Sequence, residues 1–173
     1  MLNPLVEGSD MGAALSLVIW LVTSRCDMRC SYCYMGGLKG EFSYREAIGV
    51  AGGLAGLAPR SLGITGGGPL LWPPLREVLR SLRNVGLGTS IQSNMRLFDI
   101  GYAKLFADLD ILLFTSLDGA DNLTHEACRG IVSWDTGVRG LKIAYDQGLD
   151  FATVTTISHV DVDKPPSILE FSV

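Results

Sequence analysis

The sequence predicts an α/β fold in which the strands of one parallel sheet alternate with helices. Five short segments that we expect to be strands alternate along the chain with segments that we expect to be helices. A polar or glycine-rich turn follows each of the five expected strands. Such alternation is typical of a parallel sheet joined by right-handed crossovers. In sheets of this kind the turns at the carboxyl ends of the strands carry the chemistry.

The first strand and the first helix are expected on either side of a loop that contains cysteines. Residues 14–22 (ALSLVIWLV) are apolar and rich in β-branched and aromatic side chains, which predicts a buried strand. The loop that follows extends as far as Gly40. Ser43 and Glu46 have the spacing of a capping box, which predicts a helix over residues 44–57.

The later elements show the same two signals. Pro74 is expected in the first turn of the second helix, where its missing N–H costs nothing. Apolar residues recur on one face of that helix until Gly86 ends it. We expect further strands over residues 61–65, 89–93, 111–116 and 151–157, and further helices from residue 74, over 100–107, over 133–147 and from residue 164.

The chain is long enough for one compact domain with a sizeable core. Residues 1–12 are mixed in composition, and we expect a loosely ordered lead-in to a single domain over residues 13–173. Of the 173 residues, 47% are hydrophobic and 18% are charged. The sheet is therefore expected either to be buried on both sides or to present apolar surface to a partner or a further segment.

Charge and targeting signals exclude several kinds of partner. The net charge is −4, and the one basic stripe (Arg76, Arg80 and Arg83) is expected to be a solvated helix face. We therefore expect neither nucleic acid nor an anionic membrane as partner. The apolar run over residues 11–24 is too short to span a membrane and lacks the basic flank of a signal peptide. A cytoplasmic location is expected.

Three of the four cysteines lie in one short loop directly after the first predicted strand. Cys26, Cys30 and Cys33 have the spacing C-x3-C-x2-C. In a reducing compartment such a cluster points to metal binding rather than to disulfides. Three thiolates this close in sequence can bind a metal centre without long-range loop closure. Because iron–sulfur cubanes usually have four Cys ligands, three would leave one iron open to another molecule.

The alternative interpretation of the cysteine loop is a structural zinc site. Zinc sites usually combine two pairs of Cys or Cys and His ligands at matching spacing. Here the fourth cysteine, Cys128, stands alone, and His125 and His159 show no ligand-like pairing. The spacing therefore favours an iron–sulfur cluster with an open iron.

The cysteine motif resembles that of the radical S-adenosylmethionine (radical SAM) superfamily, C-x3-C-x-aromatic-C at the end of the first barrel strand. Tyr32 fills the aromatic position, which in the family packs near the adenine. The resemblance implies a [4Fe–4S] cluster on Cys26, Cys30 and Cys33 whose open iron chelates the methionine end of S-adenosylmethionine. Reductive cleavage then gives a 5′-deoxyadenosyl radical that abstracts hydrogen from a peptide or small-molecule substrate. An electron donor of the flavodoxin or ferredoxin type is also implied.

A glycine turn after the second predicted strand is similar to the Gly-Gly-Glu-Pro segment of the family. It comprises Gly66, Gly67, Gly68 and Pro69. Taken alone, it predicts only an ordinary turn, but it follows one βα unit after the cysteines. We expect these glycines to allow close approach of the backbone to the amino end of the cofactor. Gly68 replaces the usual Glu and so removes a carboxylate that is expected to bind the methionine ammonium group.

The turn after the third predicted strand, Ser93 and Asn94, resembles the Thr-Asn turn of the family, and the resemblance implies contact with the cofactor. Without the resemblance these residues mark a simple turn. The fifth predicted strand would lie beside the adenine through its backbone. His159, where many relatives carry Asn, is expected to be an incidental loop residue.

Two further segments, residues 112–119 (LLFTSLDG) and 125–130 (HEACRG), resemble the branch of the family that modifies peptides and proteins. By this resemblance, Ser116 and Asp118 face the ribose or methionine end of the cofactor, and Arg129 pairs with its carboxylate. Without it, Asp118 could cap the following turn and Arg129 could be a solvated surface charge.

The resemblance covers residues 15–173 and implies an incomplete parallel (β/α) partial TIM barrel of about five βα units, with the active site at the carboxyl ends of the strands. Family members commonly have a sixth unit, which is not evident here, and no cysteine follows Cys128. A chain shortened at its C-terminus, a minimal member and a barrel completed by a partner subunit are all compatible with this. A cluster-binding fragment without turnover and a zinc module remain alternative functions.

Overall fold

The computed structural model describes residues 15–35 and 40–157, and in it five parallel strands form one sheet. The strand order, β1-β2-β3-β4-β5, follows the chain. Each neighbouring pair is parallel, so every connection crosses over to the adjacent strand. The partial (β/α) barrel is confirmed. The strands are β1 (Leu17–Leu21), β2 (Ser61–Thr65), β3 (Thr89–Ser93), β4 (Leu112–Ser116) and β5 (Phe151–Val154).

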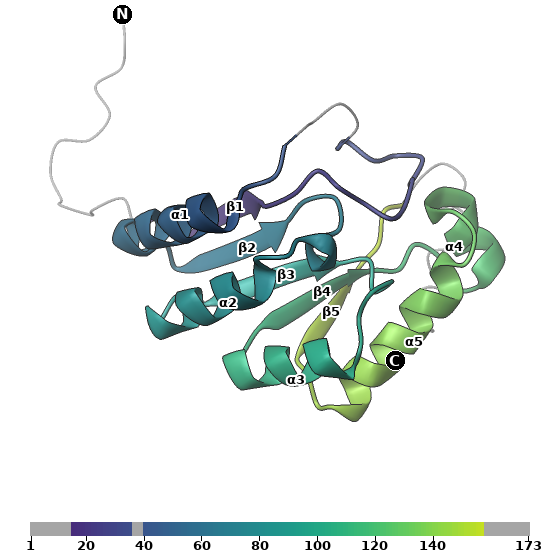
Figure 1. The fold of residues 1–173 in the computed structure, drawn as a ribbon. Coiled ribbons are helices and arrows are strands. Elements are labelled where there is room, and N and C mark those ends of the chain that lie inside the picture. Colours follow the sequence, from purple (N-terminus) through teal and green to yellow (C-terminus); the bar gives the residue numbers. More distant parts are fainter. Residues whose placement is uncertain (1–14, 36–39, 158–173) are drawn as a thin grey trace, which may run out of the picture.

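Helices α1, α2 and α3 lie along one face of the sheet, and α4 and α5 pack together near its other end (Figure 1). The arrowheads of the strands point toward the edge over which the cysteine loop passes (Figure 1). This arrangement puts the loop and the turns after the strands on the same side. The helices are α1 (Tyr44–Leu57), α2 (Leu75–Asn84), α3 (Ile100–Leu109), α4 (Asn122–Arg129) and α5 (Ser133–Asp146), with a short 3-10 helix η1 (Pro69–Leu71).

The core lies between the sheet and the helices. Alternate strand residues such as Ile64, Ile91 and Leu113 are fully buried there, because successive side chains of a strand point to opposite faces. The apolar stripe of α2, which contains Leu75 and Leu79, packs on the same face. This stripe has the helical spacing expected from the sequence.

The opposite face of β1 is apolar and exposed. Leu17 is 54% exposed and Ile19 is 59% exposed. Trp20, which follows Ile19 and points to the other face, is buried in the core. Within the described part of the chain, β1 is therefore not buried on both sides. Some of the many hydrophobic residues of the sequence therefore lie exposed on this strand.

Local signals placed several elements correctly. The bounds of α1, β2 and β3 match the expected ranges. The predicted capping box is present, since Ser43 Oγ accepts from the backbone N–H of Glu46 and the Glu46 carboxylate accepts from the backbone N–H of Ser43. The fifth strand ends at Val154 rather than at residue 157. The lead-in over residues 1–12, His159 and the helix from residue 164 lie outside the described residues.

Helix α4 was not predicted from the sequence. Eight residues give barely two turns, too few for a clear helical period. The local signal was the N-cap Asp121, whose carboxylate accepts a hydrogen bond from the backbone N–H of Thr124 at 2.8 Å.

The arginine stripe on α2 is only partly a solvated face. The guanidinium of Arg76 lies over the ring of Tyr102, 4.0 Å from its centroid. Arg83 forms an exposed ion pair with Asp110 at 3.3 Å. Two of the three arginines thus bind neighbouring side chains, while Arg80 is exposed.

Candidate cluster and cofactor site

The cysteine loop and the carboxyl ends of the strands enclose a cavity of about 310 Å³. All of the site residues predicted from the sequence line this cavity except Gly68, Pro69 and Asp118. Segments far apart in the sequence therefore meet at one place. The predicted residues that line it are Cys26, Cys30, Tyr32, Cys33, Gly66, Gly67, Ser93, Asn94, Ser116 and Arg129.

Gln92 and Thr156 also line the cavity. Gln92 was not predicted from the sequence, whereas Thr156 lies in the segment that was expected beside the adenine. Gln92 alternates with the buried Ile91, so strand periodicity could have placed it on the face away from the helices. Its Nε2 lies 3.4 Å from Ser116 Oγ on the adjacent strand. Thr156 follows the end of β5, where periodicity no longer indicates direction.

The three thiols of the loop border the cavity in a partly exposed setting. Cys26 and Cys33 are exposed and Cys30 is half-buried. Partial burial raises the pKa of Cys26 and of Cys30, while the positive charge of Arg129 lowers both. A metal centre must therefore displace thiol protons when it binds. Among the described residues, no group of three or more His, Cys, Asp or Glu side chains lies close enough together for a single metal ion.

The first two glycines of the β2 turn contact the cysteine loop. A Cβ atom on Gly66 would lie 2.4 Å from the carbonyl oxygen of Thr23, and one on Gly67 would lie 2.2 Å from that of Arg25. The Gly67 N–H donates to the Thr23 carbonyl at 2.8 Å. The expected reason for these glycines, close approach to a cofactor, is thus joined by a stronger one. They let the protein's own loop backbone pack against the turn.

Gly68 and Pro69, the last two residues of this turn, do not line the cavity. Both are buried, and Pro69 begins the short helix η1. The Gly68 N–H donates to the carbonyl of Arg25 at 2.7 Å, which ties the turn to the cysteine loop a second time. A Cβ atom on Gly68 would lie 3.5 Å from Asp27 Oδ1. The position of the missing Glu is therefore next to another carboxylate.

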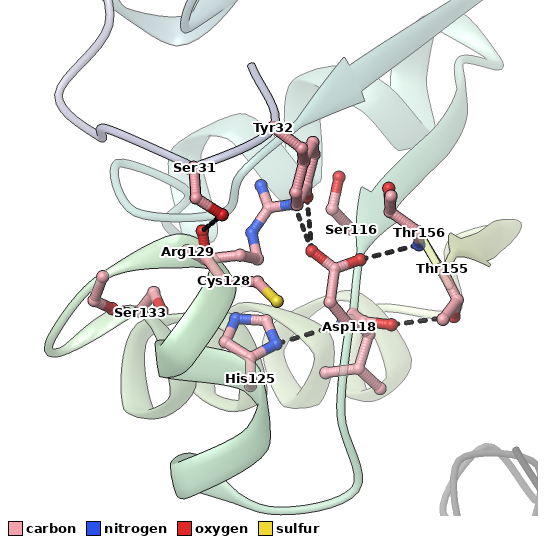
Figure 2. Close-up of polar contacts among 12 residues, drawn as sticks. Ser31, Tyr32, Ser116, Asp118, His125, Cys128, Arg129, Ser133, Thr155 and Thr156 are labelled. Carbon is pink, nitrogen blue, oxygen red and sulfur yellow. Dashed lines mark hydrogen bonds and ion pairs between the residues drawn. The ribbon is translucent and has the colours of Figure 1, made fainter. Parts of the chain in front are cut away.

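A buried polar cluster joins the cysteine loop to the turns after β4 and β5 (Figure 2). The Asp118 carboxylate is fully buried and forms an ion pair with Arg129 at 3.0 Å. It also accepts hydrogen bonds from the Tyr32 hydroxyl and, at 2.9 Å, from the backbone N–H of Thr156. Arg129 donates to the Tyr32 hydroxyl at 2.6 Å. We call these side chains the Asp118 cluster.

The Asp118 cluster settles two alternatives left open by the sequence. Arg129 is only 7% exposed, so a solvated surface charge is ruled out. The Asp118 carboxylate binds Tyr32, Arg129 and the Thr156 N–H instead of the following turn, and the cap of the next helix is Asp121. Asp118 thus holds Arg129 and Tyr32 in place at the wall of the cavity. Burial raises the pKa of Tyr32, and the neighbouring Asp118 carboxylate raises it further, so the phenol stays protonated.

Residues of helix α4 make two further contacts next to the Asp118 cluster. The backbone N–H of Asp118 donates to His125 Nδ1 at 3.1 Å, and the imidazole packs edge-on against Trp134. Burial lowers the pKa of His125, and the nearby Arg129 lowers it further, which favours the neutral ring. The carbonyl of Cys128 accepts from the backbone N–H of Ser31 at 2.9 Å. Cys128 is buried, as expected, and its backbone holds the cysteine loop (Figure 2).

A larger cavity of about 460 Å³ lies beside the end of β1. Its lining includes Thr23, Glu41 and Phe42 but no cysteine. Met35 and Gly40 also line it. The chemistry-bearing side chains therefore gather in the smaller cavity. No helix within residues 15–35 and 40–157 is both long and apolar enough to cross a bilayer.

Known proteins resemble this chain over most of its length. The family model described as "Radical SAM superfamily" matches residues 20–171. Fe-coproporphyrin III synthase of Methanosarcina barkeri is 27% identical over 160 residues, which is 89% of this chain and 40% of the relative. A probable GTP 3′,8-cyclase of Saccharolobus islandicus is 30% identical over 133 residues, or 74% of this chain and 43% of the relative. The chain thus spans about two fifths of the length of these relatives.

Solved structures share the fold. The structure of anSMEcpe with bound AdoMet superposes with a TM-score of 0.77 at 21% identity, over 91% of this chain and 48% of that one. SuiB of Streptococcus suis superposes with a TM-score of 0.79 at 17% identity, over 92% of this chain and 37% of that one. With a matching family model over residues 20–171 and this common fold, the chain belongs to the radical SAM superfamily, whose members are enzymes.

Proposed function

We propose that this chain binds a [4Fe–4S] cluster through Cys26, Cys30 and Cys33 and holds S-adenosylmethionine in the adjoining cavity. The observation that carries the proposal is the meeting of three thiols and the strand-end turns around one cavity of about 310 Å³. When bound, this pair supplies reductive cleavage of the cofactor to a 5′-deoxyadenosyl radical, which abstracts hydrogen from a substrate. The protein supplies ligands, orientation and shelter from water.

The donor set fits a cluster better than a zinc ion. A single metal ion needs ligands that converge on one point. In a cubane each thiolate binds a different iron, so the thiols need to surround a volume instead. The loop thiols border the cavity in this way, and no described group of ligands converges for one ion.

Three side chains on the cavity wall are suited to the cofactor itself. Arg129 has a fixed guanidinium that would bind a carboxylate, and Asp118 keeps it in place. The Tyr32 ring, held through its hydroxyl, would pack beside an adenine. Ser116 Oγ would bind a ribose hydroxyl. The backbone of the Gly66 turn is open to the methionine end, as is the turn at Ser93.

The proposed substrate is a peptide or a small molecule. The curated relatives are named for the synthesis of a porphyrin and for cyclisation of GTP, whereas one solved structure of SuiB carries its precursor peptide SuiA. A flavodoxin or ferredoxin would supply the electron, and a partner subunit could complete the barrel. We propose a cytoplasmic location, the compartment that keeps such thiols reduced.

One observation favours a second candidate, a chain that binds the cluster without turnover. Gly68 stands where the family motif has a carboxylate beside the ammonium group of the cofactor. Without that carboxylate, the affinity of the chain for S-adenosylmethionine would fall. The two candidates agree on the cluster and differ only in cofactor cleavage.

Anaerobic reconstitution tests both candidates. Iron, sulfide and zinc are measured first, and 5′-deoxyadenosine is measured after reduction with dithionite in the presence of S-adenosylmethionine. Stoichiometric zinc without a cluster would overturn the proposal, and a cluster without 5′-deoxyadenosine would support the second candidate. Cys30→Ala should abolish iron loading and cleavage, whereas Cys128→Ala should leave iron loading intact because Cys128 lies outside the cavity.

A further inference from the structure

Asn94 lies in the turn after β3, and its carboxamide is bound on both sides. Its Oδ1 accepts a hydrogen bond from the backbone N–H of Arg96 at 3.0 Å. Its Nδ2 donates to Asp27 Oδ1 at 2.8 Å. Only one assignment of the amide oxygen and nitrogen satisfies both contacts, so the orientation of the carboxamide is determined.

The same amide nitrogen lies near the first cysteine of the loop. Asn94 Nδ2 lies 3.9 Å from Cys26 Sγ, within reach of a sulfur acceptor. Both residues line the same cavity. An NH₂ group has two donors, so Asn94 can bind Asp27 and Cys26 at once.

Asp27 is itself held in place. Its backbone carbonyl accepts from Arg96 Nη1 at 3.2 Å, so the turn after β3 binds the loop at two points of the same residue. Its carboxylate lies 3.5 Å from the position of a Cβ atom on Gly68. Glycine at that position places no side chain of its own beside the Asp27 carboxylate, which binds Asn94.

We propose that Asn94 is a positioning residue for the metal centre, which donates an N–H···S hydrogen bond to the Cys26 thiolate while Asp27 fixes its amide. The inference rests on the proposed function, because it requires the cluster on Cys26. A hydrogen bond to a ligand sulfur stabilises the more negative, reduced cluster and so raises its reduction potential. Groups that orient metal ligands typically contribute about 10–100-fold to metal affinity.

Two variants separate this role from a purely structural one. Asn94→Ser keeps a short acceptor for the N–H of Arg96 but is too short to reach the sulfur. The exchange variant Asp27→Asn with Asn94→Asp keeps a hydrogen bond between the two side chains, with the donor now on residue 27. The side chain of residue 94 then has no N–H to donate to the sulfur. Asn84→Asp, on the exposed end of α2, is the matched control.

The readouts are the reduction potential of the reconstituted cluster, iron retention against a chelator and the urea unfolding of the metal-free protein. Both test variants should show a more negative potential and about tenfold or greater loss of iron retention. The exchange variant should unfold at the same urea concentration as the wild type, and Asn84→Asp should match the wild type throughout. A variant that folds normally but retains no iron also supports the inference.

Two results would overturn the inference. One is an unchanged potential and iron retention in both variants. The other is an exchange variant that recovers wild-type stability and potential together, because the pair would then act only by holding the loop. Failure of the proposed function is distinguishable, since the wild-type chain itself would then bind no cluster.

Discussion

The carboxylate of Asp118 and the guanidinium of Arg129 form an ion pair of 3.0 Å that is almost completely buried. The pair joins the turn after β4 to the last turn of α4. Because the Tyr32 hydroxyl binds both partners, the pair also holds the cysteine loop (Figure 2). The wall of the candidate site therefore depends on one buried charge.

Asp118→Ala should strongly destabilise the fold, because it leaves Arg129 buried without its partner. Removal of one member of a buried pair typically lowers the free energy of unfolding by about 3–5 kcal/mol. Urea unfolding of the metal-free protein measures the change. The matched control is Asp146→Ala, which breaks the exposed Lys142–Asp146 pair and should cost about 0.5 kcal/mol or less. Equal effects of the two substitutions would contradict the structural role of Asp118.

Tyr32→Phe should cost about 0.5–1.5 kcal/mol of unfolding free energy, because it removes the hydroxyl but keeps the ring. Iron loading should stay at the wild-type level, since the three thiols are unaffected. Tyr145→Phe, on an exposed residue, is the control and should have no measurable effect. Wild-type stability in Tyr32→Phe would show that the hydroxyl contacts contribute nothing.

Gly67→Ala should displace the cysteine loop, because the new Cβ would lie 2.2 Å from the carbonyl oxygen of Arg25. We expect a loss of about 1–3 kcal/mol of unfolding free energy together with reduced iron loading after reconstitution. Gly52→Ala is the control: it lies in α1 with no atom near the new Cβ, and it should stabilise the protein by about 0.5–1 kcal/mol. Normal iron loading in Gly67→Ala would show that the loop tolerates the shift.

The stability of the fold should fall on mild acidification because of His125. Its folded-state pKa lies below the ordinary value of about 6.5, so between the two values the unfolded chain binds a proton that the folded chain does not. The contribution is fully present above about pH 6.5 and is lost as the pH falls toward the folded-state value. Urea unfolding from about pH 8 down to about pH 5 measures it.

His125→Asn keeps an acceptor for the backbone N–H of Asp118 but cannot gain the proton. Its stability should therefore vary less with pH than that of the wild type over this range. An identical pH profile in the two proteins would assign the acid sensitivity to other groups.

The sequence by itself determined what local patterns encode. The capping box of Ser43 and Glu46 predicts the start of α1, and the strands expected over residues 61–65 and 89–93 match β2 and β3. The spacing of three cysteines after a strand predicts a metal-binding loop. These signals lie within a few residues of one another, so no knowledge of packing is needed to recognise them.

Tertiary structure alone decided the contacts between distant segments. Tyr32 lies 86 residues from Asp118 and 97 from Arg129, and no local pattern predicts that their side chains meet. The same holds for Asn94 and Asp27, which are 67 residues apart. The sheet brings these groups together because parallel crossovers place every strand's carboxyl end on one edge. Packing there buries Asp118, which the sequence predicted as a cofactor contact, as the charge that binds Arg129 and Tyr32.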